Sequence, residues 1–209
     1  NSNDASFSNS FQYFINFESS ADSPYEIALY NSKGKKVRDL ITNKELQRTI
    51  DNLAISKKEF GTFKTVSNID LNYWIIKPKD FDPKKEYPAI FMIYGGPGKN
   101  TVMDEWGGSN YFWHQMLAQE GYIVISVDPR GTMYRGRDFK HSTYMNLGKL
   151  ETEDMIEAAK FFGNQPYIDK DRLGMMGWSY GGFMTSLAMT KGADYFKMGI
   201  AVAPVTNWR

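Results

Sequence analysis

A serine flanked by glycines stands where an apolar run gives way to a helical pattern. Residues 177–181, Gly-Trp-Ser-Tyr-Gly, have the form Gly-x-Ser-x-Gly and directly follow the apolar residues 173–176. On a sharp strand-to-helix turn such a serine is exposed as a nucleophile, and the glycines allow the turn to pack closely. The free N–H groups at the helix start point toward an anion that forms there. The alternative is a glycine-rich turn with a capping serine, and the flanking strand and helix favour the nucleophile at Ser179.

A tyrosine followed by glycines forms the second candidate feature. Residues 94–98, Tyr-Gly-Gly-Pro-Gly, follow the apolar run 89–94, which reads as a strand buried on both faces. Ligands bind at the carboxyl ends of such strands, and in α/β hydrolases the loop at this place contributes to the oxyanion hole. The Tyr94 phenol and the Tyr180 backbone N–H would then be the two hydrogen-bond donors of an oxyanion hole. The alternative is that Tyr94 only packs under a Gly-Pro turn, and the Gly-x-Ser-x-Gly pattern favours the oxyanion role.

A catalytic serine also needs a base and a carboxylate that orients the base. In α/β hydrolases these follow the nucleophile in the order Ser, Asp or Glu, His. Both histidines here, His114 and His141, precede Ser179. We therefore expect the Asp and His beyond Arg209, and we expect this chain to be an inactive fragment of an enzyme.

Other polar residues are interpreted as structural. Asp128 and Arg130 end another predicted strand, and an Asp–Arg contact within their turn explains them without chemistry. Glu151, Glu153 and Asp154 open a predicted helix, where a solvated acidic first turn interacts favourably with the helix dipole. Neither set predicts a catalytic group.

Composition excludes several classes of function. The chain has 209 residues, 42% of them hydrophobic, and its 25 basic and 24 acidic residues give a net charge of +1. This balance argues against nucleic acid or an anionic membrane as partner. No apolar run reaches the roughly 20 residues that span a bilayer, and the first residues do not resemble a signal peptide. The absence of cysteine, the two histidines and the lack of a Gly-x-Gly-x-x-Gly spacing predict no metal and no cofactor.

The first quarter of the chain is predicted to be β structure without helices. Strands are expected at 11–17, 25–31 and 36–40, the last two joined by a hairpin turn. Apolar residues at helical spacing predict a linker helix over 43–53, with Asn43 as its N-cap. Since three short strands do not make a stable unit alone, we interpret residues 1–52 as the end of a larger β domain and its linker.

From residue 53 onward, strands and helices alternate. This order predicts an α/β sheet with right-handed crossovers over residues 53–209. Strands are expected at 60–77, 89–94, 123–127, 173–176 and 198–203, and helices at 111–119, 151–162 and 180–191.

These motifs together resemble the prolyl oligopeptidase family of serine peptidases, in particular its dipeptidyl peptidase branch. The resemblance rests on GWSYGG at 177–182, IYGGPG at 93–98 and GIAVAPVTNW at 199–208. It runs from about residue 39 to the end and is strong in the last 120 residues. It implies a β-propeller followed by an α/β-hydrolase domain, of which this chain would hold the end of the propeller and the sheet without its last strands.

The resemblance also implies roles for individual residues. Ser179 would be the acylated nucleophile, and Tyr94 with the Tyr180 N–H would bind the oxyanion. Tyr180, Val205 and Trp208 would border a pocket for proline or alanine, so that the enzyme would release N-terminal dipeptides from peptide substrates. Without the resemblance, Val205 and Trp208 read equally well as core residues at a strand end.

The family further suggests a homodimer in the periplasm or outside the cell. Two alternatives remain open: an acylaminoacyl peptidase or esterase of the same fold, and a non-catalytic interaction module.

Overall fold

The structure is a computed structural model that describes residues 1–53 and 55–208. These residues form two compact units. The first consists of Asn1–Lys58 with Met103–Gln115, and the second of Glu59–Val102 with the chain from Met116 onward. The domains expected at 1–52 and 53–209 stay a prediction. Within the described residues, no helix is long and apolar enough to cross a membrane.

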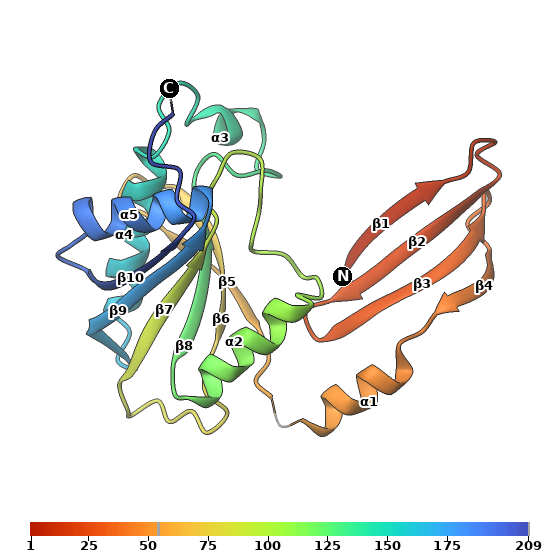
Figure 1. The fold of residues 1–209 in the computed structure, drawn as a ribbon, viewed down its shortest axis with the longest axis horizontal. Helices are drawn as coiled ribbons and strands as arrows, with labels where there is room; N and C mark the ends of the chain where they lie inside the picture. Colours follow the sequence, from red (N-terminus) through yellow and green to blue (C-terminus); the bar gives the residue numbers. More distant parts are fainter. Residues whose placement is uncertain (54, 209) are drawn as a thin grey trace. The chain divides into compact units, whose positions relative to one another are not determined.

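The first unit contains an antiparallel sheet in which each strand pairs with the next along the chain (Figure 1). Sequence predicted only three of its four strands. The first strand, Ser2–Phe7, is polar and mostly exposed, and its conformation comes from pairing with the second. Stacked aromatic rings support the sheet, with Phe14 and Tyr30 5.2 Å apart between centroids. The strands are β1 (Ser2–Phe7), β2 (Tyr13–Ser20), β3 (Ser23–Asn31) and β4 (Lys36–Ile41).

Helix α1 (Lys44–Asn52) follows this sheet and confirms the helix expected over 43–53. Asn43 occupies the N-cap position with φ 47°, but its side chain does not cap the helix. Its amide instead donates to the Tyr25 carbonyl at 2.6 Å. Ile50 is the one buried residue of α1 and packs near Trp106 and Tyr111 of the same unit.

The second unit is built on a six-stranded sheet with the order β10-β9-β7-β8-β6-β5. Strands β10, β9, β7 and β8 run parallel, and β6 is antiparallel to both β8 and β5. This arrangement confirms the predicted α/β sheet. The strands are β5 (Glu59–Lys64), β6 (Asp70–Ile76), β7 (Tyr87–Ile93), β8 (Ile123–Asp128), β9 (Ile168–Trp178) and β10 (Phe196–Val202).

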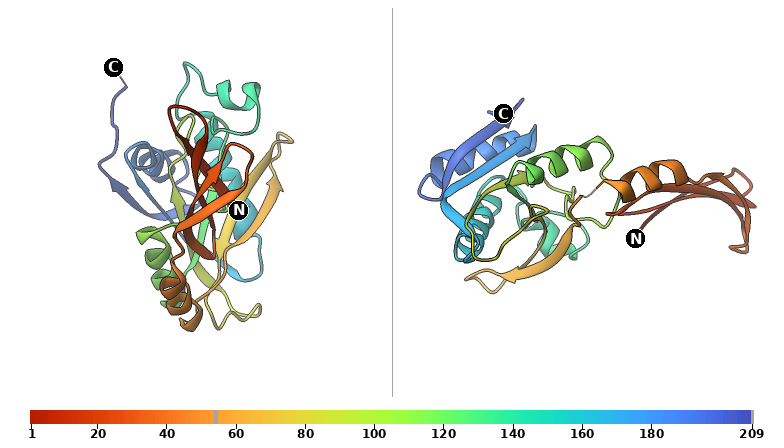
Figure 2. Two further views of the ribbon diagram at one scale, coloured as in Figure 1. Left: turned by 90° about the vertical axis from the view of Figure 1, so that its right-hand side faces the viewer. Right: turned by 90° about the horizontal axis from the view of Figure 1, so that it is seen from below.

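Helices α4 (Leu150–Gly163) and α5 (Tyr180–Lys191) cover one face of this sheet (Figure 2). Alternate residues of β7 show why its sequence lacks a polar face. Phe91 belongs to the core cluster that includes Met155 of α4 and Met184 of α5, whereas Ile90 and Met92 belong to the cluster on the other face. A strand buried on both faces is apolar throughout, as the run 89–94 indicated.

Three elements differ from the sequence expectation. The strand expected at 60–77 is the hairpin β5–β6, because residues 65–69 form a turn closed by the Thr65 N–H and the Ile69 carbonyl. The strand expected at 173–176 is the core of the longer β9. Helix α3 (Arg137–His141) is not among the expected helices, and helix α2 (Ser109–Gln119) confirms the helix expected at 111–119.

The packing of Phe162 in the core of the second unit predicts that its truncation lowers stability strongly. Phe162 is 1% exposed, and its ring lies 5.0 Å from that of Tyr73 and 5.7 Å from that of Phe91. Phe162→Ala is expected to lower the free energy of unfolding by about 3–5 kcal/mol through lost burial and the cavity left behind. Val66→Ala, at a side chain that is 87% exposed, should change it by less than about 0.5 kcal/mol. Denaturant unfolding measures both, and equal losses would contradict this packing.

Candidate active site

Ser179 lies between the end of β9 and the start of α5 with φ 57° and ψ −112°. Such an angle pair is unfavourable for a residue with a side chain and costs about 1–3 kcal/mol. Hydrogen bonds hold it in place. The Ser179 N–H donates to the Val202 carbonyl at 2.9 Å, and its own carbonyl accepts from the N–H groups of Phe183 at 3.0 Å and Val205 at 3.4 Å. The serine therefore has the strained backbone of a nucleophile elbow.

The glycines around Ser179 lie where backbone segments touch. A Cβ on Gly177 would collide with the Gly181 carbonyl, and one on Gly181 would collide with the Ile93 carbonyl. A Cβ on Gly182 would lie 2.8 Å from the Val202 carbonyl oxygen. These contacts bring the start of α5 against the ends of β7, β9 and β10. The spacing of glycines in the sequence follows from this close approach.

Tyr94 follows directly on β7, at the same edge of the sheet as the serine. Strands β7 and β9 are parallel neighbours with Ile93 opposite Gly177, so that both chains leave the sheet side by side. The half-buried Tyr94 ring lies 6.1 Å from the Tyr180 ring, and the Lys99 ammonium group lies 4.7 Å from its centroid. The structure thus brings Tyr94, Tyr180 and Ser179 to one place, and the oxyanion role of the two tyrosines stays a prediction.

The loop after Tyr94 is fixed by a buried carboxylate. Asp128 is 4% exposed and accepts hydrogen bonds from the Asn100 amide at 2.8 Å, the Thr101 N–H at 2.8 Å, the Thr101 hydroxyl at 2.9 Å and the Val102 N–H at 3.2 Å. Burial raises the pKa of Asp128, and these hydrogen bonds oppose the rise. The interpretation of Asp128 and Arg130 as partners in one turn is wrong, because Asp128 anchors the loop 100–102.

Arg130 instead pairs with Asp154 on α4. Its guanidinium donates to the Asp154 carboxylate at 2.6 and 3.0 Å, and its backbone N–H donates to the same group at 2.8 Å. Asp154 and Glu151 are both fully buried, whereas the Glu153 side chain is 52% exposed. The expectation of a solvated acidic first turn is therefore wrong for Glu151 and Asp154. Glu151 and Asp154 are three positions apart and share one helix face with Met155 and Ala158. This spacing was the sequence signal that both carboxylates face inward.

Glu151 contacts the residue next to the serine. The Tyr180 hydroxyl donates to a Glu151 carboxylate oxygen at 2.5 Å, and Tyr180 is 4% exposed. Burial and, after it, the hydrogen bond to Glu151 raise the pKa of Tyr180, so that its phenol stays protonated and remains a donor. Sequence reasoning missed this pair, because the two residues are 29 positions apart.

Val205 and Trp208 follow the end of β10 and lie close to Ser179 and Tyr180, so neither belongs to a strand. Val205 bonds to the Ser179 carbonyl through its N–H, and the Trp208 ring lies 5.3 Å from the Tyr180 ring. Trp208 is 51% exposed, so it is not a core residue. It also borders a mostly apolar cavity of about 610 Å³. The cavity is lined by Pro97, Lys140, His141, Thr143, Tyr144, Met145, Asn146, Leu147 and Trp208.

The two histidines occupy different surroundings. His141 is exposed at the end of α3 and borders the cavity just described. His114 lies in the first unit, where burial and the nearby Lys58 lower its pKa to about 4.

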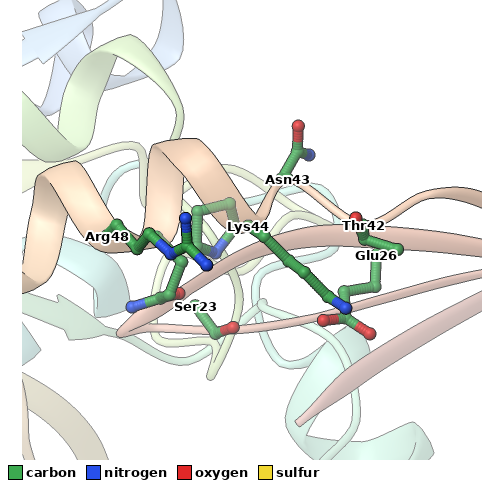
Figure 3. A pocket seen from close by; sticks show the side chains of 8 residues that line it. Ser23, Glu26, Thr42, Asn43, Lys44 and Arg48 are labelled. Carbon is green, nitrogen blue, oxygen red and sulfur yellow. The ribbon is translucent and has the colours of Figure 1, made fainter.

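The first unit has a cavity of its own at the start of α1 (Figure 3). It measures about 350 Å³ and is lined by side chains of both charges, including Glu26, Lys44 and Arg48. Its lining residues include no histidine, and Glu26 is the one carboxylate among them. We assign it no chemistry.

Comparisons with known proteins find chains similar to this one. A model of the prolyl oligopeptidase family matches residues 109–209. The probable dipeptidyl-aminopeptidase B of Trichophyton verrucosum is 38% identical over 99% of this chain and 23% of its own length. The bovine (Bos taurus) prolyl endopeptidase FAP is 39% identical over 83% of this chain and 22% of its own length. The chain thus spans about a quarter of these curated relatives.

A solved structure is similar over the same extent. The crystal structure of Porphyromonas gingivalis dipeptidyl peptidase 4 matches with a TM-score of 0.94 and 43% identity. The match covers 99% of this chain and 29% of that one. At this level of identity the likeness extends to sequence as well as fold.

Close packing at the elbow predicts a severe effect of one added methyl group. Gly181→Ala would force its Cβ into the Ile93 carbonyl, which cannot move without displacing β7. We expect a loss of at least about 3 kcal/mol in unfolding free energy, since backbone has to shift. Gly163→Ala, at the end of α4, meets the nearest atom at 3.3 Å and should change stability by less than about 1 kcal/mol. Denaturant midpoints compare the two, and a tolerated Gly181→Ala would refute the close approach.

Proposed function

The chain belongs to the prolyl oligopeptidase family, and on this premise we propose that the whole protein is a serine peptidase acylated on Ser179. The observation that carries the proposal is the strained Ser179 backbone between a parallel strand and a helix, at the sheet edge that also holds Tyr94. This geometry exposes a hydroxyl next to hydrogen-bond donors. A glycine-rich turn with a capping serine does not require it, and Ser179 makes no side-chain cap hydrogen bond.

In the proposed reaction, the Ser179 Oγ attacks the carbonyl carbon of the scissile peptide, and its proton passes to a histidine base. The carbonyl oxygen becomes an oxyanion that accepts hydrogen bonds from the Tyr94 phenol and the Tyr180 N–H. The C–N bond then breaks, and the leaving amine takes the proton from the histidine. Water hydrolyses the ester by the same route and restores Ser179.

The base and its carboxylate are proposed to lie outside residues 1–209. Support comes from the order Ser, Asp, His in α/β hydrolases, because both histidines of this chain precede Ser179. On this proposal the chain alone is inactive. The four-stranded meander of the first unit is proposed to be a propeller blade, since blades have this form. A homodimer and a periplasmic or secreted location remain proposals from the family.

For the substrate we propose peptides with proline or alanine before the scissile bond. Tyr180, Val205 and Trp208 would form an apolar pocket, and burying a proline ring there stabilises binding by about 1.5–3 kcal/mol. The relatives named as dipeptidyl peptidases support release of N-terminal dipeptides. The relative named prolyl endopeptidase supports internal cleavage as a second candidate. A Gly-Pro anilide with a free or an acetylated amino group separates the two, because a dipeptidyl peptidase requires the free amine.

Removal of the nucleophile tests the reaction. In the whole enzyme, Ser179→Ala is expected to lower kcat for a Gly-Pro anilide by roughly 10⁵–10⁶-fold, because no acyl-enzyme forms. Ser186→Ala is the matched control, since this serine lies on the same helix and its hydroxyl donates to the Gly182 carbonyl at 3.0 Å. Steady-state hydrolysis measures both variants. Full activity of Ser179→Ala would end the proposal.

Loss of the phenol tests the oxyanion hole. Tyr94→Phe keeps the ring but removes one of two donors, so kcat should fall about 10²–10³-fold with little change in KM. Tyr87→Phe, at the opposite end of β7, loses a hydrogen bond from the Asp82 N–H and should keep kcat within about twofold. Kinetics on the Gly-Pro anilide compare them. An unchanged kcat for Tyr94→Phe would show that Tyr94 only packs beneath its turn.

A further inference from the structure

We propose that Glu151 is a positioning residue for the oxyanion hole. Its buried carboxylate holds the Tyr180 phenol and thereby orients both the backbone N–H of Tyr180 and the ring that borders the substrate pocket. The inference rests on the proposed function of Ser179 and Tyr180, and it adds a residue to which no role in the reaction was assigned.

The contact is short and fully enclosed. Tyr180 is the first residue of α5, directly after Ser179, and its hydroxyl lies 2.5 Å from the Glu151 carboxylate. This distance is typical of an O–H···O⁻ hydrogen bond, which is stronger than one between neutral groups. Glu151 is 0% and Tyr180 4% exposed, so water does not compete for either group. A bond of this kind restricts the tyrosine to one orientation.

Glu151 is itself held by the turn before α4. Its second carboxylate oxygen accepts from the Gly148 N–H at 3.0 Å, and the Gly148 carbonyl accepts from the Thr152 hydroxyl at 2.6 Å. Gly148 has φ +83°, and a Cβ there would lie 2.7 Å from atoms of Phe183 and Leu187 on α5. The turn therefore packs against the helix that carries Tyr180. Each carboxylate oxygen of Glu151 accepts a hydrogen bond, so the carboxylate is held in one position.

The Tyr180 ring contacts other aromatic residues of the proposed site, so its orientation affects theirs. Its centroid lies 6.1 Å from that of Tyr94, 5.3 Å from that of Trp208 and 5.5 Å from that of Phe183. Tyr94 is the second proposed donor to the oxyanion, and Trp208 is a proposed pocket residue. Without its acceptor, the buried Tyr180 hydroxyl would have to turn toward another partner, and the ring would move with it. Both donors and the pocket wall would then lose their alignment.

A purely structural role for Glu151 makes a different prediction. Loss of a buried hydrogen bond would then lower the melting temperature, while the folded fraction would keep its kcat. A positioning role lowers kcat in protein that remains folded. Two measurements distinguish the structural role from the positioning role. One is whether a variant changes kcat or KM, and the other is whether the effects of the Glu151 and Tyr180 variants on kcat are additive.

The experiment uses Glu151→Gln, Tyr180→Phe and the double variant in the whole enzyme. Glutamine offers one acceptor in place of two, so either the Tyr180 hydroxyl or the Gly148 N–H loses its partner. Each single variant should lower kcat for the Gly-Pro anilide about 10–100-fold with KM changed less than about threefold, since misplacing a donor costs less than removing it. The double variant should be no worse than the more severe single one within about threefold, because both changes break one bond.

Asp154→Asn is the matched control for the loss of a buried carboxylate. Asp154 is as buried as Glu151 and lies on the same helix, but it pairs with Arg130. It should lower the melting temperature and leave kcat within about twofold. If Glu151→Gln fails to fold, the kcat of Tyr180→Phe tests the inference by itself, because this variant leaves the Glu151 carboxylate in place. A kcat within twofold of the wild type for Tyr180→Phe, or additive losses in the double variant, would overturn the inference.

A second readout separates this inference from the proposed function. A fluorophosphonate reacts with a serine nucleophile and places an oxygen in the oxyanion hole without a peptide. If the wild type fails to cleave the Gly-Pro anilide but Ser179 is phosphonylated, the substrate proposal fails. The same four variants are then ranked by phosphonylation rate, with Tyr180→Phe and Glu151→Gln again expected about 10–100-fold slower. If Ser179 is not phosphonylated in the wild type, the proposed function and this inference both fail.

Discussion

The positive φ of Ser179 is the constraint on which the second unit depends. A conformation that costs about 1–3 kcal/mol persists only where its surroundings determine it. Here the Val202 carbonyl holds the serine N–H, and Gly177 and Gly181 admit backbone contacts that no larger residue would allow. Strand β10, the start of α5 and the end of β7 thus meet at one residue. Their contacts hold the Ser179 backbone in this conformation.

Buried carboxylates stabilise the segments around this point. Asp128 anchors the loop that follows Tyr94, and Glu151 accepts a hydrogen bond from the Tyr180 hydroxyl. Asp154 pairs with Arg130 and fixes the turn after β8. A buried carboxylate is costly unless it is hydrogen-bonded, and each of these accepts at least two bonds. The loops at this edge of the sheet are therefore held by specific polar contacts as well as by apolar packing.

The sequence predicted features that have local signals and missed those set by pairing or by distant contacts. The Gly-x-Ser-x-Gly spacing, the apolar run of β7 and the helical pattern of α5 have local signals, and the structure confirms the sheet they imply. Strand β1 was missed because its residues are polar and only its partner defines it. Glu151 and Asp154 were read as solvated because acidic residues favour a helix start, and their partners lie far away in the sequence. The roles of Tyr94, Val205 and Trp208 stay predictions.

A crystal structure of the whole enzyme with a phosphonate bound covalently to Ser179 tests the central claim most directly. The claim is that the strained serine presents its hydroxyl to two donors, the Tyr94 phenol and the Tyr180 N–H. It predicts a phosphonyl oxygen within about 2.7–3.1 Å of both donor atoms, the distance at which oxyanion donors act. A phosphonate attached to another residue would contradict the claim. So would an adduct on Ser179 whose oxygens all lie beyond about 3.5 Å from both donors.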